Sequence, residues 1–155
     1  MDLKSFAIYM GVPEECFEGL DLSSLPDYDE LLPDCVNLLA LYRWTFAQIQ
    51  RQLQTDASKV TQLNQLLFEC ASYATGTYED AQYEEVDVNT LEYFETHIDE
   101  AEQLGKAFHI VAEAYRNGSR LAMDKNKAID CYRQAIALGC EIPTKHLQYI
   151  CTNLG

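Results

Sequence analysis

The residues of this 155-residue chain with the greatest chemical capacity are three histidines, six cysteines and 25 acidic residues. Zinc sites and many catalytic sites show histidine and cysteine at a fixed local spacing. The histidines, His97, His109 and His146, lie in no His-Glu-x-x-His pattern, and no Cys-x-x-Cys pair or glycine-rich phosphate loop occurs. Carboxylate pairs are too common in so acidic a chain to indicate acid–base catalysis. We therefore predict no metal site, no cofactor and no enzymatic activity.

The six cysteines are scattered, and most stand beside apolar residues in helical patterns: Cys16, Cys35, Cys70, Cys131, Cys140 and Cys151. The first residues contain an apolar run too short for a secretory signal, so we expect a reducing, cytoplasmic location and thiols packed in a core. His146 and Cys151 share one predicted helix, with Cys140 before it, but we expect them to be structural. A cysteine nucleophile paired with a distant histidine is an alternative that leaves no local pattern.

The formal charge is −14, and it is unevenly distributed. Residues 1–105 hold four basic and 21 acidic residues, a charge of −17, whereas residues 106–155 hold seven and four, a charge of +3. Repulsion between like charges excludes direct binding to nucleic acid or to an anionic membrane surface. No apolar stretch is long enough to span a bilayer. This asymmetry favours a basic protein as partner, and high solubility alone is the other interpretation.

The stretch TYEDAQYEEVDVNTLEYFE, Thr77 to Glu95, alternates tyrosines with acids. Tyrosine provides a large contact area at low entropic cost, and carboxylates steer and pair with lysine and arginine. We predict that nine residues of this stretch contact a basic partner: Tyr78, Glu79, Asp80, Tyr83, Glu84, Glu85, Asp87, Glu92 and Glu95. The alternative is a solvated segment whose tyrosines turn into the core.

Helical periodicity with glycine and proline breaks runs through most of the chain beyond residue 33, and no strand alternation is long enough to interpret. The pattern predicts helices over 34–53, over 60–75 with Gly76 as the stop, from Asn89 to Gly105, over 106–117 with Gly118 as the stop, from an Asp124 cap to Leu138, and over 144–153 with Leu147, Ile150 and Cys151 inward. The predicted fold class is all-α.

Two stretches share a Tyr-x-x-Gly pattern about 40 residues apart, Tyr73 with Gly76 and Tyr115 with Gly118, which is typical of a helical solenoid. The second stretch resembles the Sel-one-like repeat, a relative of the tetratricopeptide repeat, at nine positions: Ala112, Tyr115, Gly118, Asp124, Lys127, Ala128, Tyr132, Ala135 and Gly139. It departs from that pattern where Cys131-Tyr132 stands for Trp-Tyr and where the loop lacks a second glycine. The resemblance implies paired helices that serve as a docking platform.

We therefore predict a single all-α domain built as a short helical-hairpin repeat array. Residues 1–55 form an N-terminal helical cap, 58–105 a degenerate repeat, 106–139 the Sel-one-like repeat and 143–155 a C-terminal capping helix. The predicted function is that of an interaction protein, an acidic immunity or antitoxin type that binds and blocks a basic partner such as a nuclease toxin. The alternative is an adaptor or bacterial effector scaffold with no inhibitory role.

Overall fold

A computed structural model describes residues 1–55, 57–83 and 88–152 of the chain, and all regular structure in them is helical. The elements are α1 (Leu3–Met10), the 3-10 helix η1 (Glu14–Phe17), α2 (Asp34–Thr55), the 3-10 helix η2 (Ala57–Lys59), α3 (Val60–Tyr83), α4 (Val88–Thr96), α5 (Ile98–Asn117), α6 (Lys125–Ala137) and α7 (Thr144–Thr152). Within these ranges a single isolated bridge joins Asp2 to Asp27, and there is no strand. The predicted all-α class is confirmed. None of the described helices has the length and apolar character needed to cross a membrane.

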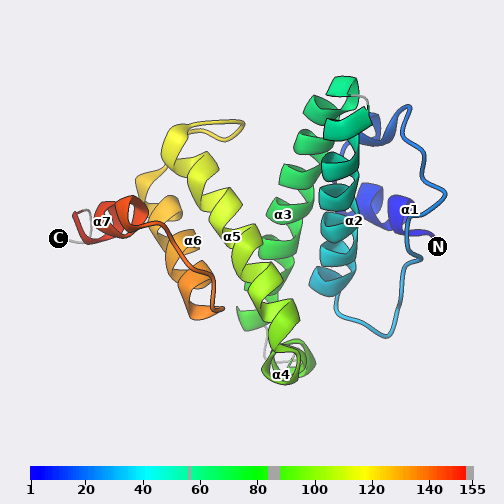
Figure 1. Ribbon diagram of the computed structural model, residues 1–155. Helices are drawn as coiled ribbons and strands as arrows, with labels where there is room; N and C mark the ends of the chain where they lie inside the picture. The colour runs from blue at the N-terminus through cyan, green and yellow to red at the C-terminus, as the bar shows by residue number, and fades with distance from the viewer. Residues whose placement is uncertain (56, 84–87, 153–155) are drawn as a thin grey trace. The chain divides into compact units, whose positions relative to one another are not determined.

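The chain divides into two compact units, which we call unit 1 (Met1–Leu91) and unit 2 (Glu92–Gly155). Within unit 1 the long helices α2 and α3 lie side by side, and within unit 2 α5 packs along α6 (Figure 1). The division falls inside the segment 58–105 that the sequence analysis assigned to one degenerate repeat. That repeat was expected to begin with α3. In the structure α3 packs mainly on α2, the helix before it.

Unit 1 is built around the α2–α3 pair, whose facing leucines are almost wholly buried, among them Leu38, Leu41, Leu63 and Leu66. The N-terminal segment is attached to this pair by side chains of α3. The Gln62 amide donates to the carbonyls of Glu15, Cys16 and Glu18 at 2.7–3.3 Å, and the Tyr73 hydroxyl donates to the Gly11 carbonyl at 3.1 Å. These bonds connect η1, Glu18 and the turn at Gly11 to α3.

Unit 2 contains the helical hairpin expected from the sequence. Three alanines, Ala112, Ala128 and Ala135, have no exposed surface, as expected where small residues allow two helices to pack closely. Gly118 ends α5 with a left-handed φ of 68°, and the Asp124 carboxylate caps α6 by accepting from the Lys127 amide at 3.0 Å. The predicted stop at Gly118 and the predicted cap at Asp124 are confirmed.

Two predicted helix ends are wrong. Gly76 lies inside α3, which continues to Tyr83, and Gly105 lies inside α5. The cost of a glycine in a helix, about 1 kcal/mol, is smaller than the gain from buried side chains on both sides of it. The break instead occurs at His97, between α4 and α5. Because Gly118 ends a helix and Gly76 does not, the two Tyr-x-x-Gly stretches are not structurally equivalent.

The two interior glycines predict opposite responses to alanine. A Cβ at Gly76 would meet nothing within 4 Å, so Gly76→Ala is expected to stabilise the protein by about 0.5–1 kcal/mol. A Cβ at Gly105 would lie 3.1 Å from the Ala135 carbonyl oxygen and 3.1 Å from the Cys140 Cβ, so Gly105→Ala is expected to destabilise it by about 1 kcal/mol. Urea unfolding followed by circular dichroism measures both, and an equal gain in the two variants would contradict the close packing at Gly105.

Candidate functional site

The acidic, tyrosine-rich segment is divided between the two units. Unit 1 holds the C-terminal end of α3, where Asp80 is exposed, Glu79 is partly exposed and Tyr83 has 84% of its side-chain surface exposed. On α4 in unit 2, Glu92 and Glu95 are exposed and lie three residues apart, on the same side of the helix. Three further predicted contact residues, Glu84, Glu85 and Asp87, lie outside the described residues.

Tyr78 is the exception among the predicted contact residues. Only 7% of its surface is exposed, and burial raises the pKa of its phenol above the usual value. Its side chain belongs to the core of unit 1, which is the alternative that the sequence analysis left open for these tyrosines. Tyr83, five residues further along α3, is the tyrosine that the fold leaves available to a partner.

The end of α3 combines several sources of negative potential. The helix contains no lysine or arginine, and Asp80 lies in its last turn, where the backbone carbonyls already carry partial negative charge. A carboxylate at that end of a helix costs about 0.3–1 kcal/mol. Unit 1 as a whole holds four basic and 16 acidic residues, a formal charge of −12, while unit 2 holds seven and nine, a charge of −2.

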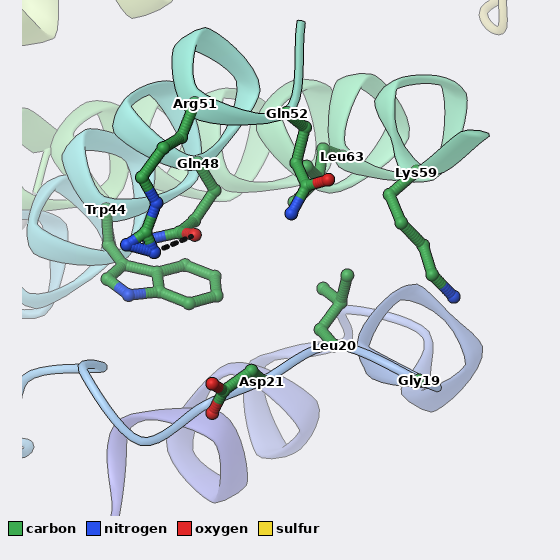
Figure 2. Close-up of a pocket in the computed structure, with 9 residues that line it drawn as sticks. All are labelled: Gly19, Leu20, Asp21, Trp44, Gln48, Arg51, Gln52, Lys59 and Leu63. Atoms are coloured by element: carbon green, nitrogen blue, oxygen red, sulfur yellow. Dashed lines mark hydrogen bonds between the residues drawn. The ribbon is translucent and has the colours of Figure 1, made fainter. Parts of the chain in front are cut away.

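A pocket of about 230 Å³ in unit 1 lies between α2 and the loop that follows η1 (Figure 2). Arg51 and Trp44 line it from α2, Lys59 from η2 and Asp21 from the loop, and the Arg51 guanidinium donates to the Gln48 side chain at 3.3 Å. No histidine, cysteine or hydroxyl side chain lines the pocket, and its ionisable side chains are Asp21, Arg51 and Lys59.

Unit 2 contains a second group of polar side chains, which we call the histidine cluster: His109, Glu113, Arg116 and His146. His109 Nε2 lies 3.1 Å from His146 Nδ1, and Arg116 Nη2 lies 3.0 Å from His146 Nε2. Glu113 Oε1 lies 3.5 Å from the Nε2 atoms of both histidines. The fully buried Tyr132 of α6 packs against the two rings, with centroid distances of 5.7 and 5.5 Å.

Burial determines the charge state of both imidazoles. It is the largest cause that lowers the pKa of His109 and of His146, and the positive Arg116 lowers both further. The Glu113 carboxylate acts in the opposite direction on each ring. Both rings are therefore neutral near pH 7, which suits the hydrogen bond that His146 accepts from Arg116.

This cluster was not predicted from the sequence. His109 and Glu113 are four residues apart on α5, a spacing that places them on one helix face and could have been noticed. His146 comes from α7, 37 residues after His109. The apolar pattern selected Leu147 as the inward residue of that helix, but Leu147 is 39% exposed and His146 is 2% exposed. Because histidine is polar, apolar periodicity does not identify a histidine that is buried with its hydrogen bonds satisfied.

The cysteines bear on the alternative of a nucleophilic enzyme. The side chains of Cys16, Cys35, Cys70 and Cys131 are buried, and that of Cys140 is partly exposed. Burial raises the pKa of the Cys70 and Cys140 thiols, which lowers the fraction of reactive thiolate at neutral pH. The expected packing of thiols in the core is confirmed for the four buried cysteines, Cys16, Cys35, Cys70 and Cys131.

Thiol labelling of the folded protein tests that alternative. Among the five cysteines above, we expect Cys140 to react first with a disulfide reagent near pH 8, and the four buried thiols to react about 100-fold more slowly or only on unfolding. Mass spectrometry of peptides after timed quenching measures each rate, with urea-unfolded protein as the reference. Rapid labelling of a buried cysteine in folded protein would contradict this expectation and support a nucleophile.

Comparisons of the chain with protein-family models, with curated proteins and with solved structures find no match. The resemblance to the Sel-one-like repeat therefore stays a prediction that depends on nine positions in residues 112–139.

Proposed function

We propose that this chain is an interaction protein that binds a basic protein through the acidic, tyrosine-bearing end of α3, and that the acids Glu92 and Glu95 of α4 form a separate contact. In its most concrete form it is an immunity or antitoxin type of inhibitor. Its carboxylates would occupy the cationic groove with which a nuclease toxin holds nucleic acid, and binding would thereby block the toxin. Acidic side chains placed against such a groove form charge-assisted hydrogen bonds with lysine and arginine.

The observation that carries this proposal is Tyr83, which is 84% exposed at the end of a helix without a single basic residue. Tyrosine is enriched among the residues that dominate protein–protein binding energies. Asp80, three residues earlier, is exposed in a turn where a carboxylate weakens the helix. An exposed aromatic ring beside a destabilising acid is more easily explained by selection for binding than by selection for stability.

The test begins with capture of partners on immobilised full-length protein at low salt, followed by identification and purification of each captured protein. We expect the main partner to be basic. The variant Tyr83→Ala is expected to weaken its affinity about 30-fold, the loss typical of a central aromatic contact. Isothermal titration calorimetry with the purified partner measures the change.

Tyr9→Ala is the matched control, because Tyr9 is 81% exposed on α1 and lies outside the acidic segment. Its affinity for the partner should equal that of the unaltered chain. Equal losses in the two variants would indicate a general effect of removing surface tyrosines. A neutral or acidic partner that is insensitive to Tyr83→Ala would contradict the proposal and favour a general scaffold.

A further inference from the structure

Three side chains of the histidine cluster bring possible metal-ligand atoms close together. Glu113 Oε1 lies 3.5 Å from His109 Nε2 and 3.5 Å from His146 Nε2, and one ligand atom of each side chain lies within 4.8 Å of the others. In tetrahedral zinc sites, bonds of about 2.1 Å place neighbouring ligand atoms about 3.4 Å apart. The two separations of 3.5 Å therefore match the edge of such a tetrahedron.

The hydrogen bonds determine which ring nitrogens carry lone pairs. A guanidinium only donates, so His146 Nε2 accepts from Arg116 and carries no proton. A neutral His146 then holds its proton on Nδ1 and donates it to His109 Nε2, which therefore also carries no proton. Each of the two Nε2 lone pairs therefore accepts one hydrogen bond, and an ion bound by both nitrogens and the Glu113 carboxylate would replace these two hydrogen bonds with coordination.

We propose that His109, Glu113 and His146 bind a divalent transition-metal ion of the zinc class. Two imidazoles and one carboxylate are a ligand set that zinc accepts, and three protein ligands leave the fourth position to water or another donor. The ion takes the Nε2 lone pair of His146 from Arg116, and it takes the Nε2 lone pair of His109 from the Nδ1 proton of His146. The proposal does not depend on the acidic surface or on its partner.

The surrounding fold favours this site. His109 and Glu113 project from the same face of α5 because they are four residues apart. His146, the third residue of α7, is 2% exposed, and Tyr132 packs against both imidazole rings. Packing restricts the positions of these side chains, which lowers the entropy that binding an ion would cost. A bound ion would link His146 of α7 to His109 and Glu113 of α5. Metal binding is therefore expected to stabilise the packing of the C-terminal helix.

The test uses the full-length chain, freed of metal with a chelator and titrated with Zn²⁺ and with Co²⁺. We expect one equivalent of each ion to bind, and His109→Ala and His146→Ala each to weaken binding at least about tenfold. His97→Ala is the matched control, because His97 lies in the same unit outside the cluster and should not alter the affinity. Binding that is absent, or equal in all variants, would overturn the proposal.

Two further measurements keep the result decisive if an alanine variant fails to fold. In the unaltered chain, nitrogen NMR of the imidazoles should show Zn²⁺-dependent shifts at His109 and His146 and none at His97. Co²⁺ should give a spectrum without thiolate charge transfer, because none of the three proposed ligands is a cysteine. Shifts confined to His97, or a thiolate band, would overturn the proposal.

Arg116→Met tests the predicted competition. Removing the guanidinium frees the His146 Nε2 lone pair, so Zn²⁺ should bind several-fold more tightly than to the unaltered chain. Weaker binding would contradict the placement of the ion at Nε2.

Discussion

A chain in which Glu79→Lys and Asp80→Lys are combined is expected to lose at least about 100-fold in affinity for its basic partner. The Asp80→Lys change in this variant is expected to add about 0.3–1 kcal/mol of stability, since Asp80 lies in the last turn of the helix. The reason is that a lysine suits the negative C-terminal end of α3, whereas the native carboxylate opposes it. Calorimetric titration with the purified partner and urea unfolding measure the two effects.

Glu14→Lys with Glu15→Lys provides the matched control, because both glutamates are exposed on η1 in the same unit and the net charge changes equally. We expect this control to retain affinity within about threefold at moderate salt. Glu92→Lys with Glu95→Lys tests the α4 part of the proposed surface in the same way. A loss of affinity in the η1 control as large as in the α3 variant would mean that total charge, rather than this surface, governs binding.

Tyr132→Ala is expected to cost unit 2 about 3–5 kcal/mol of stability, a large part of what a small domain possesses. Tyr132 of α6 has no exposed surface, and its ring packs against His109 and His146. Its removal therefore leaves a cavity beside the two imidazole rings. Urea unfolding by circular dichroism measures the loss. Trp44, the only tryptophan, lies in unit 1, so its fluorescence shows whether the effect is confined to unit 2.

Ile136→Ala is the control for Tyr132→Ala. Ile136 is 44% exposed on the same helix, and its truncation should cost about 1 kcal/mol or less. An equal loss in both variants would contradict the central position of Tyr132.

The helices were largely predictable because their signals are local. Apolar periodicity located α2 and α6, and the types of Gly118 and Asp124 fixed one helix end and one cap. The helix ends predicted at Gly76 and Gly105 were wrong, because a glycine ends a helix only where continuing the helix would bury little additional side-chain surface. The choice of partner helices was also beyond reach, because the same apolar face of α3 could have packed on the helix before it or after it.

The candidate sites differ in how far the sequence revealed them. The exposed acids of α3 and α4 were predictable from composition, since carboxylates avoid burial. The burial of Tyr78 and the exposure of Tyr83 were not predictable, because an amphipathic tyrosine ring is suited both to a core and to a surface. The histidine cluster depends on contact between α5 and α7, which no local spacing encodes.

The association rate constant of the purified partner at two ionic strengths tests the central claim most directly. If negative potential on this chain captures a cationic protein, raising the salt from about 20 mM to about 200 mM should slow association about tenfold or more, with little change in dissociation. The variant with Glu79→Lys and Asp80→Lys should show a much weaker salt dependence. Association equally fast at both salt concentrations in the unaltered chain would contradict electrostatic capture by these helices.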